Sequence, residues 1–211
     1  MDAAYLRAAN PEPFTILSTR LERFCLGHEI LLQRFGNRFS VEKRNPENPP
    51  DSTDLPLAVY ICSRPYSQDF SFDGFRIPLR ARVWNSLFGQ AYLEKAVAIF
   101  HKYIAAHTEV PEFYELGEES DKKPCGTPMV QSVKVSLEAN LGRSTEKSLN
   151  TSFSLAFWDH LTFYANQGQI QIIDEAEKAR IAEEEKIRAE TEAQIEELKQ
   201  KLFPGVKWAT V

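Results

Sequence analysis

The residues best placed for chemistry are Cys25 and His28, which lie three positions apart in the run Cys25-Leu26-Gly27-His28-Glu29. On a helix, residues three apart share a face, so this pair could bind a metal ion or act as a thiolate and its base. A structural zinc ion needs four ligands, and the chain has no second Cys-x-x-Cys or His-x-x-x-His pair. We therefore expect Cys25 in the core, and His28 near the surface or bound to a backbone carbonyl. An enzyme that uses Cys25 and His28 is the remote alternative.

The remaining polar residues give weaker signals. His101 and His107 are six residues apart and do not share a helix face, and His160 follows Asp159 on a polar face. Four acidic residues follow the second of these histidines at a spacing unlike a calcium-binding loop: Glu112, Glu115, Glu118 and Glu119. The sequence has none of the common phosphate-binding, nucleotide-binding, hydrolase or zinc-protease motifs. We therefore predict a protein that is not an enzyme and that has no cofactor and no metal.

Composition limits the class of partner. The chain has 211 residues, a net charge of -5 and an isoelectric point near 5.5. Nucleic-acid binding needs a basic face, so we expect no nucleic-acid partner. The apolar runs are too short to span a membrane, and the N-terminus lacks the pattern of a secretory signal. The cysteines Cys25, Cys62 and Cys125 are few and widely spaced, which favours reduced thiols and a cytoplasmic location.

Hydrophobic periodicity predicts a mostly α fold with an irregular helical body. The helices expected in the body are Asp2–Ala9, Leu21–Phe35, Leu55–Ser63, Gln90–Ala106, 127–141, Ser144–Leu149 and Phe153–Asn166. Glycines at positions 36, 142 and 168 provide the stops, because glycine readily takes the left-handed conformation that closes a helix. Gly27 lies inside a predicted helix, and we expect a close helix crossing there.

Three stretches between the helices read as loops. The proline-rich stretch 45–52 is a linker, and the acidic stretch 109–121 is predicted to be an exposed loop. Residues 64–88 have no assignable structure, although a short strand in 67–79 would fit the spacing of its aromatic residues. The aromatic residues Phe70, Phe72, Phe75, Trp84 and Phe88 are expected in the core rather than on a binding surface.

The composition changes after the body. Residues 174–201 are rich in Glu, Lys, Ala and Arg, without glycine or proline, and opposite charges four apart predict one long solvated helix. A heptad register gives a poor coiled-coil seam. The chain is thus expected to consist of a globular helical domain (1–170), an extended charged helix (171–203) and a short tail (204–211). The apolar residues left for a partner are Ile181, Ile187, Ile195, Leu198 and Leu202.

Three stretches of the chain resemble prophage-encoded tail assembly chaperones and related tail-cluster proteins. They are 21–32 with 36–39, then 57–64, and finally 141–144 through 155–158 to 167–168, together about a third of the chain. The shared patterns are packing patterns and contain no catalytic signature. The charged C-terminal helix has no counterpart in this resemblance.

The resemblance implies a small, acidic, mostly helical protein of a tailed phage. Such chaperones keep the long tape measure protein soluble and help tail tube subunits to polymerise around it, in the host cytoplasm. On this basis we expect a phage tail assembly chaperone that binds the tape measure protein. The alternative is a structural component of the particle, such as a neck, connector or baseplate protein. The resemblance carries no active-site residue over to this chain.

Overall fold

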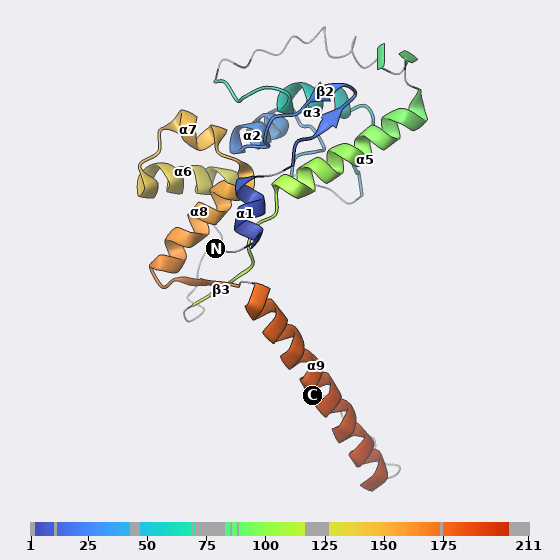
Figure 1. Cartoon of the computed structure of the whole chain (residues 1–211), viewed down its shortest axis with the longest axis vertical. Coiled ribbons are helices and arrows are strands. Elements are labelled where there is room, and N and C mark those ends of the chain that lie inside the picture. Colours follow the sequence, from blue (N-terminus) through green and yellow to red (C-terminus); the bar gives the residue numbers. More distant parts are fainter. Residues whose placement is uncertain are drawn as a thin grey trace. The chain divides into compact units, whose positions relative to one another are not determined.

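The computed structural model describes residues 3–10, 12–42, 47–68, 70, 83, 84, 86, 87, 89–116, 127–173 and 175–202. The fold is mostly α, with a long charged helix near the C-terminus, as the sequence predicts (Figure 1). The chain divides into two compact units, Met1–Ile172 and Ile173–Val211. The first unit ends two residues after residue 170, where the sequence predicts the body to end, because it includes the whole of strand β4 (Ile170–Ile172).

The first unit begins with helix α1 (Ala3–Ala9) and a small hairpin made of β1 (Thr15–Ile16) and β2 (Thr19–Arg20). Both residues of its turn, Leu17 and Ser18, have positive φ angles of 50° and 62°. Tight hairpins favour this turn geometry because its twist matches that of the strands, but glycine or asparagine usually provides it. The sequence analysis missed the hairpin because neither residue type signals such a turn.

Helix α2 spans Leu26–Arg34 and is shorter than predicted. The expected start at Leu21 is wrong, because residues 21–24 are extended and Cys25 has φ -120° and ψ 168° as the N-cap. Cys25 forms an antiparallel β-bridge with Ser152, which holds the segment in an extended conformation. The predicted stop at Gly36 is present, with φ 63°.

Gly27 allows a close approach by an aromatic ring, not by another helix. A Cβ atom at this position would overlap the ring of Tyr66, which lies in the segment after α3 (Leu55–Cys62). The expected helix crossing at Gly27 is therefore wrong, although the requirement for a small residue is real. Tyr66 is half-buried and packs against the core.

Helix α5 (Gln90–His107) is the long helix that the periodicity predicts, and its inner face is buried. That face carries Leu93, Ala96, Phe100, Tyr103 and Ile104. Tyr92, in the first turn of the helix, lies outside this face and is 49% exposed.

Three further helices complete the body: α6 (Met129–Leu141), α7 (Thr145–Asn150) and α8 (Phe153–Asn166). The predicted stop at Gly142 is present in the left-handed conformation. Ser144 lies just outside α7 and caps it, since its side chain accepts a hydrogen bond from the Lys147 amide. Helix α8 packs against α6 and α1, and α2 packs against α3, α6 and α7 (Figure 1).

A second two-stranded antiparallel sheet pairs β3 (Phe113–Glu115) with β4. The prediction of a loop over 109–121 is therefore wrong at 113–115, while residues 117–121 lie outside the described part of the chain. The partners are nearly sixty residues apart in sequence, with Phe113 opposite Ile172, so local periodicity could not indicate the pairing. The sheet contacts the body because β4 packs against α8.

Aromatic rings form the centre of the core. Phe39 and Phe100 have ring centroids 4.6 Å apart, and Phe100 lies 5.3 Å from Tyr103. The series continues through Phe24 to Phe153, whose centroids are 5.7 Å apart. The rings thus connect α5 to α8 through the extended segment before α2.

The described residues contain only part of the stretch 64–88. Trp84 is buried and Phe70 packs partly buried against the core, as expected. Phe72, Phe75 and Phe88, the strand expected within 67–79 and the tail 204–211 lie outside the described residues. In the second unit, helix α9 spans Glu175–Leu202, close to the predicted bounds.

We predict that Gly27→Ala destabilises the protein by about 1–3 kcal/mol, because the new methyl group overfills the space against the Tyr66 ring. The loss should exceed the gain in helix propensity, which is about 1 kcal/mol. Chemical denaturation of Gly27→Ala, Tyr66→Ala and the double variant tests this origin. In a Tyr66→Ala background, Gly27→Ala should be neutral or stabilising; an equal loss in both backgrounds would show that the ring contact is not the cause.

Candidate functional site

The structure places Cys25 and His28 together but does not pair the thiol with the imidazole. Cys25 is the N-cap and lies outside the helix, so the expected shared helix face does not form. The Cys25 amide donates to His28 Nδ1 (3.3 Å), and His28 Nε2 lies 2.7 Å from the Arg64 carbonyl oxygen. These contacts define the tautomer in which Nε2 carries the proton and donates it. Both ring nitrogens are thus engaged by backbone groups.

Burial keeps both side chains neutral at pH 7. It raises the pKa of the Cys25 thiol to about 11 and lowers the pKa of His28 to about 4. A reactive cysteine needs the opposite environment, partly exposed and electropositive, in which the thiolate is favoured. Cys25 is in the core, as predicted. His28 binds a backbone carbonyl, which is one of its two predicted environments, and it is buried.

Glu29, the next residue, is a fully buried carboxylate with a structural role that the sequence analysis missed. It accepts hydrogen bonds from the Ser40 hydroxyl (2.6 Å) and from the amides of Val41 (3.0 Å) and Glu42 (3.2 Å). A buried carboxylate costs much free energy unless such donors satisfy it. Glu29 therefore fixes the turn that follows α2.

Glu42 extends this arrangement to α6. Its carboxylate accepts from the Met129 amide (2.6 Å) at the N-terminus of α6, and also from Gln33 Nε2 (2.7 Å). A carboxylate at a helix N-terminus satisfies an otherwise unpaired amide and interacts favourably with the helix dipole. The polar residues around α2 are thus used to position helices.

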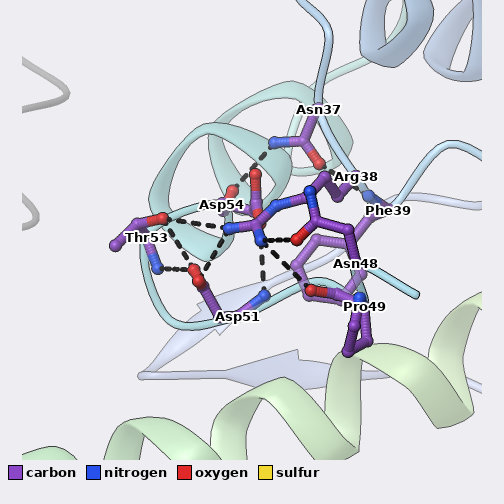
Figure 2. A network of polar contacts seen from close by, with 8 residues as sticks. All are labelled: Asn37, Arg38, Phe39, Asn48, Pro49, Asp51, Thr53 and Asp54. Atoms are coloured by element: carbon purple, nitrogen blue, oxygen red, sulfur yellow. Dashed lines mark hydrogen bonds and ion pairs between the residues drawn. The ribbon is translucent and has the colours of Figure 1, made fainter. Parts of the chain in front are cut away.

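The densest polar network surrounds Arg38 (Figure 2). Its Nε lies 2.7 Å from Asp54 and its Nη2 lies 2.7 Å from Asp51. Nη1 donates to the Asn48 side chain (2.7 Å) and to the Pro49 carbonyl oxygen (3.2 Å). The planar guanidinium suits such a set of oxygen atoms, which a lysine could not bind at once.

The network holds the loop before α3. Asp54, the N-cap of α3, makes no side-chain capping bond and directs its carboxylate to Arg38 instead. Hydrogen bonds from Thr53 and the nearby Arg38 lower the pKa of Asp51 to about 2. Asn37 joins the same loop by donating to the Asp54 carbonyl oxygen (2.9 Å). One guanidinium bridges two carboxylates that lie on the same loop, which indicates a structural clamp rather than a reactive centre.

The other histidines are distributed through the body. His107 is buried, its Nδ1 donates to the Tyr103 carbonyl oxygen (2.8 Å), and burial lowers its pKa. His160 packs edge-on against Tyr164, with ring centroids 4.9 Å apart, and burial lowers its pKa as well. His101 contacts the Phe39 ring. Within the described part of the chain, no three His, Cys, Asp or Glu side chains come close enough to hold a metal ion.

Helix α9 carries the residues that the sequence analysis assigns to a partner. Ile187 is 56% exposed and Ile195 is 46% exposed, whereas Ile181 is partly covered. Leu198 and Leu202 belong to the last two turns of the same helix. Ion pairs with neighbours support the helix, among them Arg180 with Glu177 at 2.5 Å.

The β3–β4 sheet also carries exposed apolar side chains. Phe113 is 43% exposed and Tyr114 is 45% exposed, and the adjacent Val110 and Leu116 are exposed as well. Sequence analysis missed this surface because it assigned the stretch to a solvated acidic loop. A strand with exposed aromatic side chains can add to a sheet in another molecule.

Among the residues described, no helix combines the length and the apolar character needed to cross a membrane. Comparison with protein-family models, with curated proteins and with solved structures finds no match.

We predict that stability falls as the pH is lowered from about 6.5 to about 4, in part because of His28. Its pKa is lower in the folded than in the unfolded state, so over this range the unfolded chain binds more protons and gains stability relative to the fold. The shift corresponds to at most about 3 kcal/mol. Urea denaturation at pH 7, 6 and 5 should show a shallower pH dependence for His28→Gln than for the unmodified chain. Equal slopes would contradict the assignment.

We also predict that Arg38→Lys lowers the free energy of unfolding by about 1 kcal/mol, because lysine cannot make the paired contacts that the guanidinium makes with the exposed Asp51 and the partly buried Asp54. The matched control is Arg20→Lys, at an exposed position in β2, which should change stability by no more than about 0.5 kcal/mol. Thermal and urea denaturation measure both. Equal stability of the two variants would show that the geometry of the guanidinium is unimportant.

Proposed function

We propose that this chain is a non-enzymatic protein-binding factor, and specifically a phage tail assembly chaperone that acts in the host cytoplasm on the tape measure protein. The observation that carries the proposal is helix α9, which is charged and exposed along most of its length but presents Ile187 and Ile195 to solvent. An apolar surface of a partner would remove these side chains from water, which stabilises a complex.

A long helical partner suits this surface. An amphipathic helix binds through apolar residues repeated at three- and four-residue steps, and α9 offers its own apolar residues at such steps. Before assembly, α9 would pack against apolar stretches of the tape measure protein and shield them from water. The Glu, Lys and Arg residues of α9 would keep the complex soluble. The buried, neutral Cys25 and His28 support a role other than catalysis.

The second candidate is a structural component of the particle, such as a neck, connector or baseplate protein. The exposed Phe113 and Tyr114 on β3 favour it, because a strand with an exposed apolar face can join copies edge to edge in a ring. The two candidates differ in what persists after assembly, since a chaperone is absent from finished particles.

The test is co-expression of the full chain with tape measure and tail tube proteins from the same gene cluster. We expect the tape measure protein to stay soluble and to co-purify, and Ile187→Glu with Ile195→Glu to reduce its recovery at least about tenfold, because two charges enter an apolar contact. Ala189→Glu, on the opposite face of α9, is the matched control and should keep full recovery.

Two outcomes would count against the proposal. If the double variant recovers as much tape measure protein as the control, the binding surface is not on α9. If the chain is found in purified particles in a fixed ratio to the other components, it is a structural component. A tape measure gene immediately downstream would support the chaperone function.

A further inference from the structure

From Ile187 onward, the apolar residues of α9, with Thr191 among them, recur at three- and four-residue steps, and the first three steps sum to eleven residues. Ile187, Thr191, Ile195, Leu198 and Leu202 are separated by steps of four, four, three and four residues, and we call this set the apolar stripe. At about 100° per residue these five positions fall within one narrow sector of the helix. An eleven-residue repeat corresponds to about 3.67 residues per turn, so the stripe stays on one face of a nearly straight helix.

The side chains of the stripe that the structure describes are exposed, and charged residues flank the stripe in the sequence. Both isoleucines of the stripe, Ile187 and Ile195, are among the exposed large apolar residues. The opposite face carries the small residues Ala182 and Ala189. One face of α9 is therefore distinguished from the rest by size and by polarity.

The stripe is complementary to itself when a second helix runs antiparallel. With Ile195 placed opposite Ile195 of a second copy, Ile187 lies level with Leu202 of that copy and Thr191 with Leu198, to within one residue. The arrangement follows from the residue spacing of the stripe. From Leu202 back to Ile187 the steps are four, three, four and four residues, nearly the same as in the forward direction.

The charges beside the stripe favour the same orientation. In the antiparallel pair, Glu190 and Glu192 lie level with the segment of the second copy that carries Lys199 and Lys201. A parallel pair in register would instead place the lysines of both copies at one level and the glutamates at another. Opposite charges beside an apolar seam select orientation, and like charges oppose it.

We propose that α9 pairs with α9 of a second copy of this chain, antiparallel and centred on Ile195, through the apolar stripe. The contact covers only about four helical turns and few apolar side chains, so the association is weak and reversible. The inference goes beyond the proposed function and does not depend on it. A tape measure helix would compete with the second copy for the same stripe.

Disulfide trapping of the purified full chain tests the pairing and its orientation. In a Cys125→Ser background, with Cys25 and Cys62 buried, Ile195→Cys should form a linked dimer under mild oxidation. Ile187→Cys should not, because antiparallel pairing separates the two copies of that position by about 24 Å, far beyond the reach of a disulfide. Far-UV circular dichroism confirms that both variants fold. Linked dimers at both positions would show a parallel pair, and at neither position a monomer; either result overturns the proposal.

Charge exchange provides an independent readout by sedimentation equilibrium. Glu190→Lys with Glu192→Lys, or Lys199→Glu with Lys201→Glu, should each weaken self-association about tenfold. All four substitutions together should restore it, because opposite charges face each other again. Association that ignores these changes would place the interface elsewhere and overturn the proposal. Failure to recover tape measure protein, with trapping at position 195 intact, would count against the proposed function alone.

Discussion

The fold depends on one short extended segment, residues 21–25, which connects parts of the chain that are distant in sequence. Its backbone donates to the Cys62 carbonyl oxygen at the end of α3 and accepts from the Tyr103 hydroxyl of α5. It also accepts from the Phe153 amide at the start of α8. These bonds pair the backbone of the segment with three different helices, as nearly all backbone groups inside a fold must be paired. The helices of the body are therefore arranged around an element that is itself not helical.

This constraint explains why residues with catalytic potential are structural here. Where an extended segment turns into α2, the first turn of the helix has unpaired amides that need acceptors. His28 Nδ1 accepts a hydrogen bond from the Cys25 amide, and His28 Nε2 donates to the Arg64 carbonyl oxygen. The Glu29 carboxylate accepts from the Val41 amide in the loop that follows α2. The sequence Cys25 to Glu29 therefore resembles a reaction centre, although the side chains of His28 and Glu29 form hydrogen bonds with backbone groups.

Local signals in the sequence identified most helices, and non-local ones account for the errors. Helices α5, α6 and α8 have both periodicity and terminal residues such as Gly142, so their bounds were predictable. The pairing of β3 with β4 and the bridge between Cys25 and Ser152 join segments separated by many residues, which no local pattern reports. The start of α2 was misplaced for the same reason. The exposed residues of α9 needed only helical spacing, and their positions could be read from the sequence.

The short ladder between β3 and β4 has a mechanical consequence for any partner that pulls on the C-terminal helix. β4 is the last element of the first unit, and the chain continues from it into α9 after Ile173. Tension along α9 therefore enters the body through β4, where three residue pairs with β3 and the packing against α8 share the load.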